Sequence, residues 1–177
     1  ACSGNQNETN VGGWGAILEY GEHRKELCGG EANTTNNRME MTALLQAFAA
    51  LKKEGQKIRV FSDSSYLMNC FRERWYENWR KNNWKPAKKT EVENRDLWEA
   101  LLLHLPLHEI SFYRVKGHVN LSAKAAALDS LYEKFIQWNG SDFTRDDFLY
   151  ITRQNNRADE LANAGMDQIR GGQSSPS

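Results

Sequence analysis

Three acidic residues that are far apart in the sequence, Glu40, Asp63 and Asp159, could act together as a metal site. Asp63 follows the short apolar run 58–61, and open α/β sheets bind their ligands at such carboxyl ends of strands. Glu40 lies one helical turn before Leu44, so it shares the apolar stripe that faces the sheet. Asp159 falls in the first turn of the helix expected near the end of the chain. The spacing therefore predicts three carboxylates on three separate elements.

Three carboxylates at one end of a sheet repel one another unless a hard cation neutralises them. Ligand sets made only of oxygen suit magnesium or manganese rather than zinc. Each carboxylate also has an ordinary structural role open to it, such as capping a helix or bonding a backbone N–H group. Convergence of the three side chains is what would distinguish a metal site from three local roles.

The elements that must position these carboxylates alternate along the chain. Strands are expected at 14–20 and 24–28, as a hairpin, and at 58–61 and 110–115. Helices are expected after the capping residues 34–37, at 66–74, at 92–104 and after Asn155 and Asn156. Strands that alternate with crossover helices indicate an α/β fold, and the hairpin makes the sheet mixed rather than wholly parallel.

Length and composition indicate one globular domain. A chain of 177 residues fits a single domain, which we place at 1–170 with an inserted segment at about 121–154 and a flexible tail at 171–177. The formal net charge is zero, and no apolar run is long enough to cross a membrane. The three cysteines have no metal-like spacing and indicate a reducing compartment. We expect a cytoplasmic monomer with no membrane contact.

One segment departs from this neutral balance. Residues 72–89 hold seven basic side chains against two acidic ones, a local charge of about +5. Trp79 and Trp84 are expected to pack and to anchor the segment. A basic run is often only a solvated face, and its other interpretation is a contact with a phosphate backbone.

The residues around the carboxylates resemble, in order, the motifs of type 1 ribonuclease H of the bacterial kind. The matching stretches are Ala1–Asn5, Thr34–Glu40, Ser62–Tyr66, Trp75–Trp98, Lys116–His118 and Asn155–Ala162. The resemblance covers 1–118 and about 155–169. It implies a ribonuclease H-like α/β fold, with a mixed five-stranded sheet flanked by helices in the complete protein.

The resemblance also implies an activity: endonucleolytic cleavage of the RNA strand of an RNA/DNA hybrid. Two Mg²⁺ ions, or Mn²⁺, would be held by Glu40, Asp63 and Asp159. His118 matches the family's mobile histidine, which assists proton transfer or product release. The positions that match substrate contacts are Cys2, Gly4, Asn5, Asn36 and Asn37 for the RNA strand, Thr35 and Asn94 for a DNA phosphate pocket, Trp75 for an aromatic contact, and Lys85 and Lys88 for the basic protrusion.

Two departures from the family pattern concern substrate contacts and length. Ser65 stands where bacterial relatives often carry glutamine, and Asn33 stands where arginine often flanks the phosphate pocket. About thirty extra residues, 121–154, separate His118 from the last motif. They are either a surface embellishment, with a helix over 121–138 and Phe148 packed beneath it, or a lid that restrains His118 or touches substrate.

The third departure is the largest. Family members have a central strand that ends in Asp-Gly immediately before the residues matching Ala1 and Cys2, and that aspartate bridges both metals. Neither is present in the 177 residues. Without this strand the sheet should split and leave two edges unpaired. We expect the chain either to borrow a strand or to be preceded by one, and we favour the second.

The sequence leaves alternative functions open. The chain is a hybrid-specific endonuclease, impaired as it stands because a carboxylate is absent, or a catalytically silent module that binds hybrids. A third alternative is the ribonuclease H part of a reverse transcriptase.

Overall fold

The computed structural model describes residues 2–3, 10–84 and 94–174. The strands are β1 (Cys2–Ser3), β2 (Val11–Tyr20), β3 (His23–Ala32), β4 (Lys57–Ser62) and β5 (Glu109–Arg114). The helices are α1 (Asn36–Ala49), α2 (Ser65–Arg72), α3 (Trp75–Lys81), α4 (Arg95–His104), α5 (Ala125–Asn139) and α6 (Arg145–Ser174), with a 3₁₀ turn at Leu105–Leu107. The expected alternation of strands and helices is confirmed. The hairpin is longer than the predicted 14–20 and 24–28, because β2 begins at Val11 and β3 runs to Ala32.

The described strands form two separate sheets. β2 pairs antiparallel with β1 and with β3, in a register that runs from Val11 opposite Ala32 to Tyr20 opposite His23. β4 and β5 pair in parallel and form the second sheet. The division of the sheet that the sequence predicted is therefore present, and it falls between β2 and β4.

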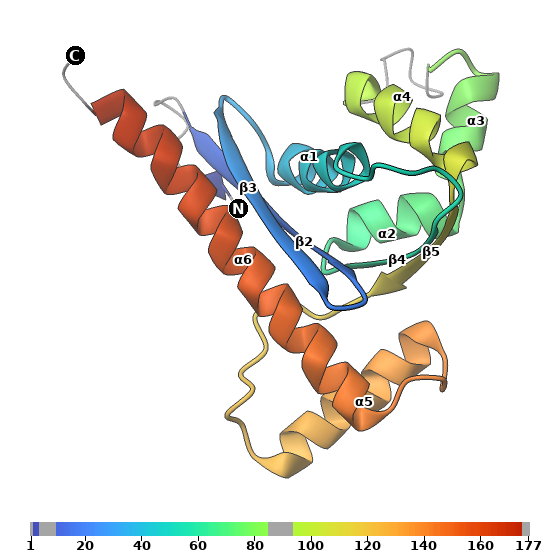
Figure 1. Ribbon diagram of the computed structural model, residues 1–177, viewed down its shortest axis with the longest axis vertical. Coiled ribbons are helices and arrows are strands. Elements are labelled where there is room, and N and C mark those ends of the chain that lie inside the picture. Colours follow the sequence, from blue (N-terminus) through green and yellow to red (C-terminus); the bar gives the residue numbers. More distant parts are fainter. Residues whose placement is uncertain (1, 4–9, 85–93, 175–177) are drawn as a thin grey trace.

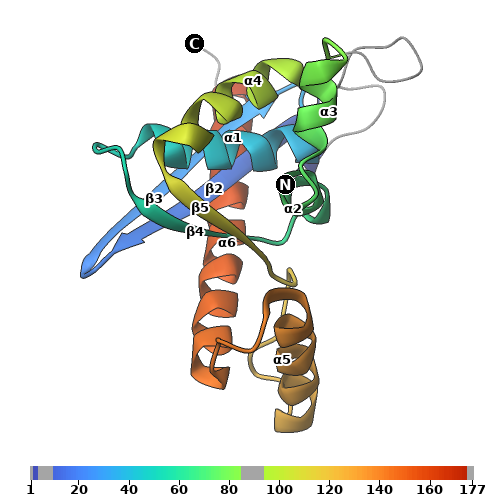
Figure 2. The same cartoon turned by 90° about the vertical axis from the view of Figure 1, so that its right-hand side faces the viewer.

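Helices α1 and α6 enclose the β2–β3 hairpin, with α1 on one face and α6 on the other (Figures 1 and 2). α6 approaches β2 closely because Gly15 has no side chain. A Cβ atom at Gly15 would lie 2.3 Å from the backbone oxygen of Ala158. This close contact sets the height of α6 over the hairpin, and Asp159 is the next residue along that helix.

The larger hydrophobic core lies between α1, α2 and α4 and one face of the β4–β5 sheet. Trp98, Met41 and Leu101 are fully buried in it. Trp84 is buried here as well, and Trp79 packs against the cluster, with its ring centroid 5.3 Å from that of Trp98. The prediction that these two tryptophans pack is confirmed.

A second, smaller core lies beneath the ends of β4 and β5. It contains Val115, Phe135, Phe143 and Phe148, and Phe61 packs against it. α5 supplies Phe135 and the first turn of α6 supplies Phe148, and α5 and the start of α6 extend away from the rest of the protein (Figure 1). The sequence correctly predicted a helix in this segment, with Phe148 packed against it.

Both ends of the last helix differ from the sequence prediction. α6 begins at Arg145, ten residues before the asparagines predicted to cap it. Thr144 and Asp147 form reciprocal bonds at this start: Thr144 N–H donates to Asp147 Oδ2 at 2.9 Å, and Asp147 N–H donates to Thr144 Oγ1 at 3.1 Å. The helix also continues to Ser174, into the predicted flexible tail, because each added residue gains a backbone hydrogen bond. None of the helices in the described ranges is both long and apolar enough to span a bilayer.

Candidate active site

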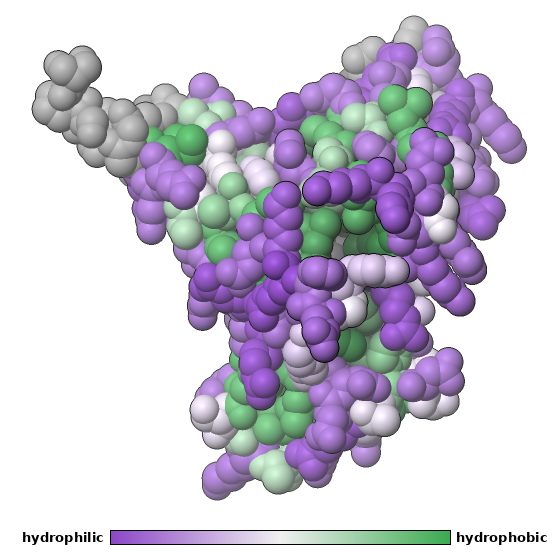
Figure 3. Space-filling view, viewed as in Figure 1, coloured by the Kyte–Doolittle hydropathy of each residue, from purple (hydrophilic) through white to green (hydrophobic). Residues whose placement is uncertain are grey.

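The three carboxylates come from three elements and line one cavity. Glu40 lies on α1, Asp63 follows the last residue of β4, and Asp159 lies on α6. The cavity, about 1130 Å³, extends between β2 and β4 where the two sheets separate. Hydrophobic residues are visible in the hollow between the two halves of the protein (Figure 3). The structure therefore brings the trio to one end of an open groove.

Burial and charge together perturb Glu40. Desolvation is the main cause, with smaller contributions from the charges of Asp63 and Asp159, and the pKa of Glu40 rises to about 7 from its ordinary 4.5. The two aspartates are thus near enough to act electrostatically on Glu40. Nevertheless, no three His, Cys, Asp or Glu side chains in the described part of the chain are grouped closely enough to hold a metal ion.

His118 lies beside this group and is bound to it. Its Nδ1 is 2.8 Å from Asp159 Oδ2, while 81% of its side chain is exposed. Its backbone has a φ of +56°, in the left-handed region that few residues other than glycine adopt. The preceding residue, Gly117, packs against Asp63: a Cβ atom there would lie 2.6 Å from Asp63 Oδ2. The loop therefore connects two of the three predicted ligands.

Two asparagines that the sequence predicted to be helix caps have other roles. Asn155 Nδ2 donates a hydrogen bond to Asp63 Oδ2 at 3.2 Å, and Asn156 Nδ2 donates one to the Val119 carbonyl at 2.9 Å. Both lie inside α6, so their backbone groups need no cap. Their side chains instead orient Asp63 and hold the end of the His118 loop. Their place inside the last motif was the only signal in the sequence.

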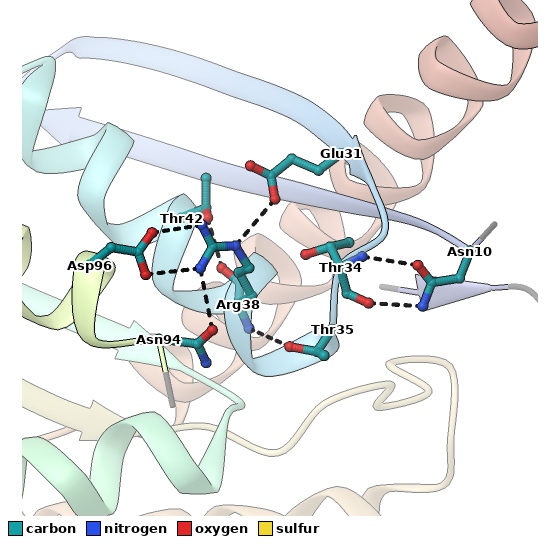
Figure 4. A network of polar contacts seen from close by, with 8 residues as sticks. All are labelled: Asn10, Glu31, Thr34, Thr35, Arg38, Thr42, Asn94 and Asp96. Atoms are coloured by element: carbon teal, nitrogen blue, oxygen red, sulfur yellow. Dashed lines mark hydrogen bonds and ion pairs between the residues drawn. The ribbon is translucent and has the colours of Figure 1, made fainter. Parts of the chain in front are cut away.

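A polar network joins the start of α1 to the start of α4 (Figure 4). Arg38 donates to Asp96 at 2.8 and 3.1 Å and to Asn94 Oδ1 at 3.3 Å. Thr35 caps α1 by accepting a bond from the Arg38 backbone N–H at 3.2 Å. The network thus places Thr35 and Asn94, the two predicted phosphate-pocket residues, on adjoining helix ends. Arg38 is a residue that the sequence prediction did not single out.

The other predicted substrate residues differ in how far the structure describes them. Asn36 and Asn37 are exposed on the first turn of α1, and Trp75 is 36% exposed at the start of α3. Cys2 is described only as part of β1. Gly4, Asn5, Lys85 and Lys88 lie outside the described residues.

Comparison with known proteins identifies the family. The family model described as RNase H matches residues 1–137, more than half of the chain. The chain belongs to the ribonuclease H family. A Ribonuclease H of Syntrophomonas wolfei is 51% identical over 118 residues, which cover 67% of this chain and 79% of the relative.

Two further ribonucleases H extend the comparison beyond the family model. The Ribonuclease H of Clostridium botulinum strain Hall is 39% identical over 169 residues, covering 96% of this chain and 92% of the relative. A crystal structure of a type 1 RNase H with the type 2 active-site motif matches with a TM-score of 0.60 and 25% identity, covering 84% of this chain and 76% of that one. The fold is therefore that of this ribonuclease H family, as the sequence predicted.

Proposed function

We propose that this ribonuclease H hydrolyses the RNA strand of RNA/DNA hybrids as an endonuclease. The observation that carries the proposal is the convergence of Glu40, Asp63 and Asp159 at one end of a groove, with His118 bonded to Asp159. A carboxylate cluster beside an exposed histidine suits phosphodiester hydrolysis, in which negative charge develops on the phosphate and a proton must reach the leaving oxygen.

The donor chemistry of the trio fits a hard divalent cation. The neighbouring carboxylates help to raise the pKa of Glu40, and a cation at the same place would relieve that repulsion. Glu40, Asp63 and Asp159 would hold Mg²⁺, or Mn²⁺ in its place, and we propose two ions. Bound there, divalent ions supply an activated water and neutralise the charge of the phosphate. The hydrogen bond from Asn155 would keep the Asp63 carboxylate turned toward the bound ions.

Residues on the first turn of α1, which precedes Glu40 by one turn, and on α3 suit a duplex of two different strands. Exposed Asn36 and Asn37 on α1 are neutral donors and acceptors, which can read the 2′-hydroxyls that distinguish RNA from DNA. Thr35, Asn94 and the N-terminus of α1 form a polar corner that could hold a phosphate of the DNA strand. Further contacts with the DNA strand could come from α3, through the ring of Trp75 and the charges of Arg80 and Lys81.

The proposal is tested with a hybrid in which the RNA strand carries the label, incubated with Mg²⁺. The 177-residue chain is compared with a version in which a strand ending in Asp-Gly precedes Ala1. We expect weak cleavage by the first and strong cleavage by the second, because a fourth carboxylate would complete the ligand set. Binding without cleavage in both would overturn the proposal, and wild-type cleavage by the 177 residues alone would contradict the expected impairment.

A second candidate is a module that binds hybrids without cutting them. It is favoured by the lack of a three-ligand metal cluster among the described residues. The cleavage test separates the two candidates, since only the enzyme gains activity from the added aspartate. A third alternative is that the chain is the ribonuclease H part of a reverse transcriptase. We also propose that the protein acts in the cytoplasm as a monomer.

A further inference from the structure

The segment 121–154 packs against the strand ends that lead into the site. Val115, Phe135, Phe143 and Phe148 form its core and are each at most 4% exposed. Tyr113 on β5 joins them through a ring contact with Phe143, with centroids 5.2 Å apart. Val115 is the residue directly before Lys116, Gly117 and His118. The segment therefore covers the start of the loop that carries His118.

The end of β5 is paired by a side chain instead of by another strand. Asn139, the last residue of α5, accepts a bond from the Arg114 backbone N–H at 2.9 Å and donates one to the Arg114 carbonyl at 2.7 Å. The side-chain amide of Asn139 thus forms hydrogen bonds with both the backbone N–H and the backbone carbonyl of Arg114. On the other side, Val115 N–H donates to the Ser62 carbonyl at 2.9 Å. The backbone is held from both sides immediately before the His118 loop begins.

Neighbouring contacts hold the end of α5 against the same strand. The Arg114 guanidinium lies 4.2 Å from the centre of the Trp138 ring, and Arg72 on α2 donates to the Trp138 carbonyl at 2.7 Å. The far end of the loop is held by α6, through the bond from Asn156 to the Val119 carbonyl. α6 itself begins within the segment. One anchor of the His118 loop, the pair of bonds at Arg114, therefore comes from residues 121–154. The other anchor, Asn156, lies just beyond the segment, on the helix that begins within it.

We propose that residues 121–154 act as a clamp on the His118 loop, with Asn139 as its positioning residue. This role rests on the proposed nuclease function and acts through His118, without contact with the substrate. The segment does not suit a grip on nucleic acid, because its five acidic residues outnumber its four basic ones. Trp138 is also a poor platform for a base, since Arg114 and Lys134 both lie over its ring.

The first test needs no nuclease activity. Hydrogen exchange is measured on the free wild-type chain, on Asn139→Ala and on Gln137→Ala, an exposed change on the same helix. The clamp predicts faster exchange in Asn139→Ala at Val115–Val119, with unchanged exchange in β2 and β3, because only the first region loses an anchor. Unchanged exchange at Val115–Val119 would overturn the clamp. Asn139→Asp is measured as well, as a control against unfolding of the segment by Asn139→Ala. It keeps the acceptor for the Arg114 N–H and replaces the donated bond by repulsion between a carboxylate oxygen and the Arg114 carbonyl, so it should also speed exchange at Val115–Val119.

The second test is a double-mutant cycle on whichever form of the chain cleaves the hybrid. Asn139→Ala should lower kcat roughly ten- to a hundredfold, with KM changed less than about twofold, since misplacement costs the chemical step and spares binding. In a His118→Ala background the same change should have little further effect, because its action passes through His118. Additive losses, or a raised KM with normal kcat, would overturn the clamp and indicate substrate contact. Absence of cleavage in every form would instead count against the proposed function, and hydrogen exchange would still decide the clamp.

Discussion

Strand edges are treated differently in two regions of the protein. They stay open at the gap between β2 and β4, and they are covered at the junction between β5 and residues 121–154. At the gap, the edges of β2 and β4 face a cavity of about 1130 Å³, and the two-residue β1 is the one described strand that pairs with this edge of β2. At the junction, Asn139 occupies the backbone groups of Arg114, and aromatic rings cover the strand ends. Unpaired edges are costly unless water or another chain reaches them.

The site lies between the gap and the junction. Some of its residues are positioned by the gap side and others by the junction side. Glu40 belongs to the gap side, where burial and the charges of Asp63 and Asp159 raise its pKa. Asp63 and His118 belong to the junction side, where Asn155 and Gly117 contact Asp63, and His118 forms its ion pair with Asp159 on α6. The junction therefore supplies more of the direct contacts that hold the site residues in place than the gap does.

The largest expected effect is the loss of catalysis on changing Asp63. In Asp63→Asn, cleavage should fall on the order of a thousandfold, because several kcal/mol of charge stabilisation is lost. Binding of the hybrid should persist, since the residues proposed to contact its two strands are unchanged. Initial rates on labelled hybrid and fluorescence anisotropy measure the two effects. Asp142→Asn, an exposed change outside the site, is the control, and a loss of less than tenfold in Asp63→Asn would contradict the assignment.

The next effect concerns the pH dependence of stability on the gap side. The pKa of Glu40 is raised to about 7 in the folded, metal-free protein, so the folded state binds the proton more tightly than the unfolded state does. The stability that this proton provides is complete below about pH 4.5 and is lost as the pH rises through 7. Glu40→Gln should therefore stabilise the protein at pH 8 by at most roughly 3 kcal/mol while removing cleavage.

This second prediction is checked by urea unfolding in EDTA at pH 5 and pH 8. Glu54→Gln is the matched control, since Glu54 is exposed. The gain should appear at pH 8 and shrink at pH 5. Equal stability of Glu40→Gln and wild type at pH 8 would show that Glu40 is well solvated. The claim that the gap side buries a carboxylate at a cost in stability would then be wrong.

A third effect tests the contact between α6 and β2. Gly15→Ala should lower stability by about 1–3 kcal/mol, because its Cβ would overlap the Ala158 backbone oxygen and force α6 away from β2. Asp159 should shift with the helix, so activity should fall as well. Thermal unfolding and cleavage rates measure both effects. Ser111→Ala, at an exposed strand position, serves as control, and an unchanged melting temperature for Gly15→Ala would disprove the close contact.

The smallest effect is expected at the Arg38 network. Asp96→Asn should cost less than about 1 kcal/mol of stability, because the side chain of Asp96 is 63% exposed. With Asn94 less firmly held, KM for the hybrid should rise roughly threefold while kcat stays the same. Glu99→Gln breaks a comparable exposed pair on the same helix and should leave KM unchanged. A fall in kcat for Asp96→Asn would place the network in the chemical step instead.

Local patterns predicted the elements and the trio, but not the contacts that fix them. The apolar run before Asp63 and the spacing around Leu44 sufficed for β4 and α1. Asn155 and Asn156 were misread as caps, because a cap and a mid-helix asparagine look alike when the upstream helix is not recognised. The signal that places the true start was present in Thr144 and Asp147.

Long-range pairs are what the sequence could not reveal. Asn139 and Arg114 are 25 positions apart, and Arg38 and Asp96 are 58 apart. Nothing in the periodicity of either segment indicates the partner. The division of the sheet could be predicted, because it follows from which strands are present in the chain. The position of the clamp could not be predicted, because it depends on how α5 packs.

The account is tested most directly by labelling the two strands of one hybrid separately. In the presence of Mg²⁺, the version of the chain with a strand ending in Asp-Gly before Ala1 should release fragments from the RNA strand and leave the DNA strand intact. Asp63→Asn in the same version should release none. Cleavage of both strands, or equal cleavage by Asp63→Asn, would contradict the claim that the carboxylates at this groove form a site specific for the RNA strand.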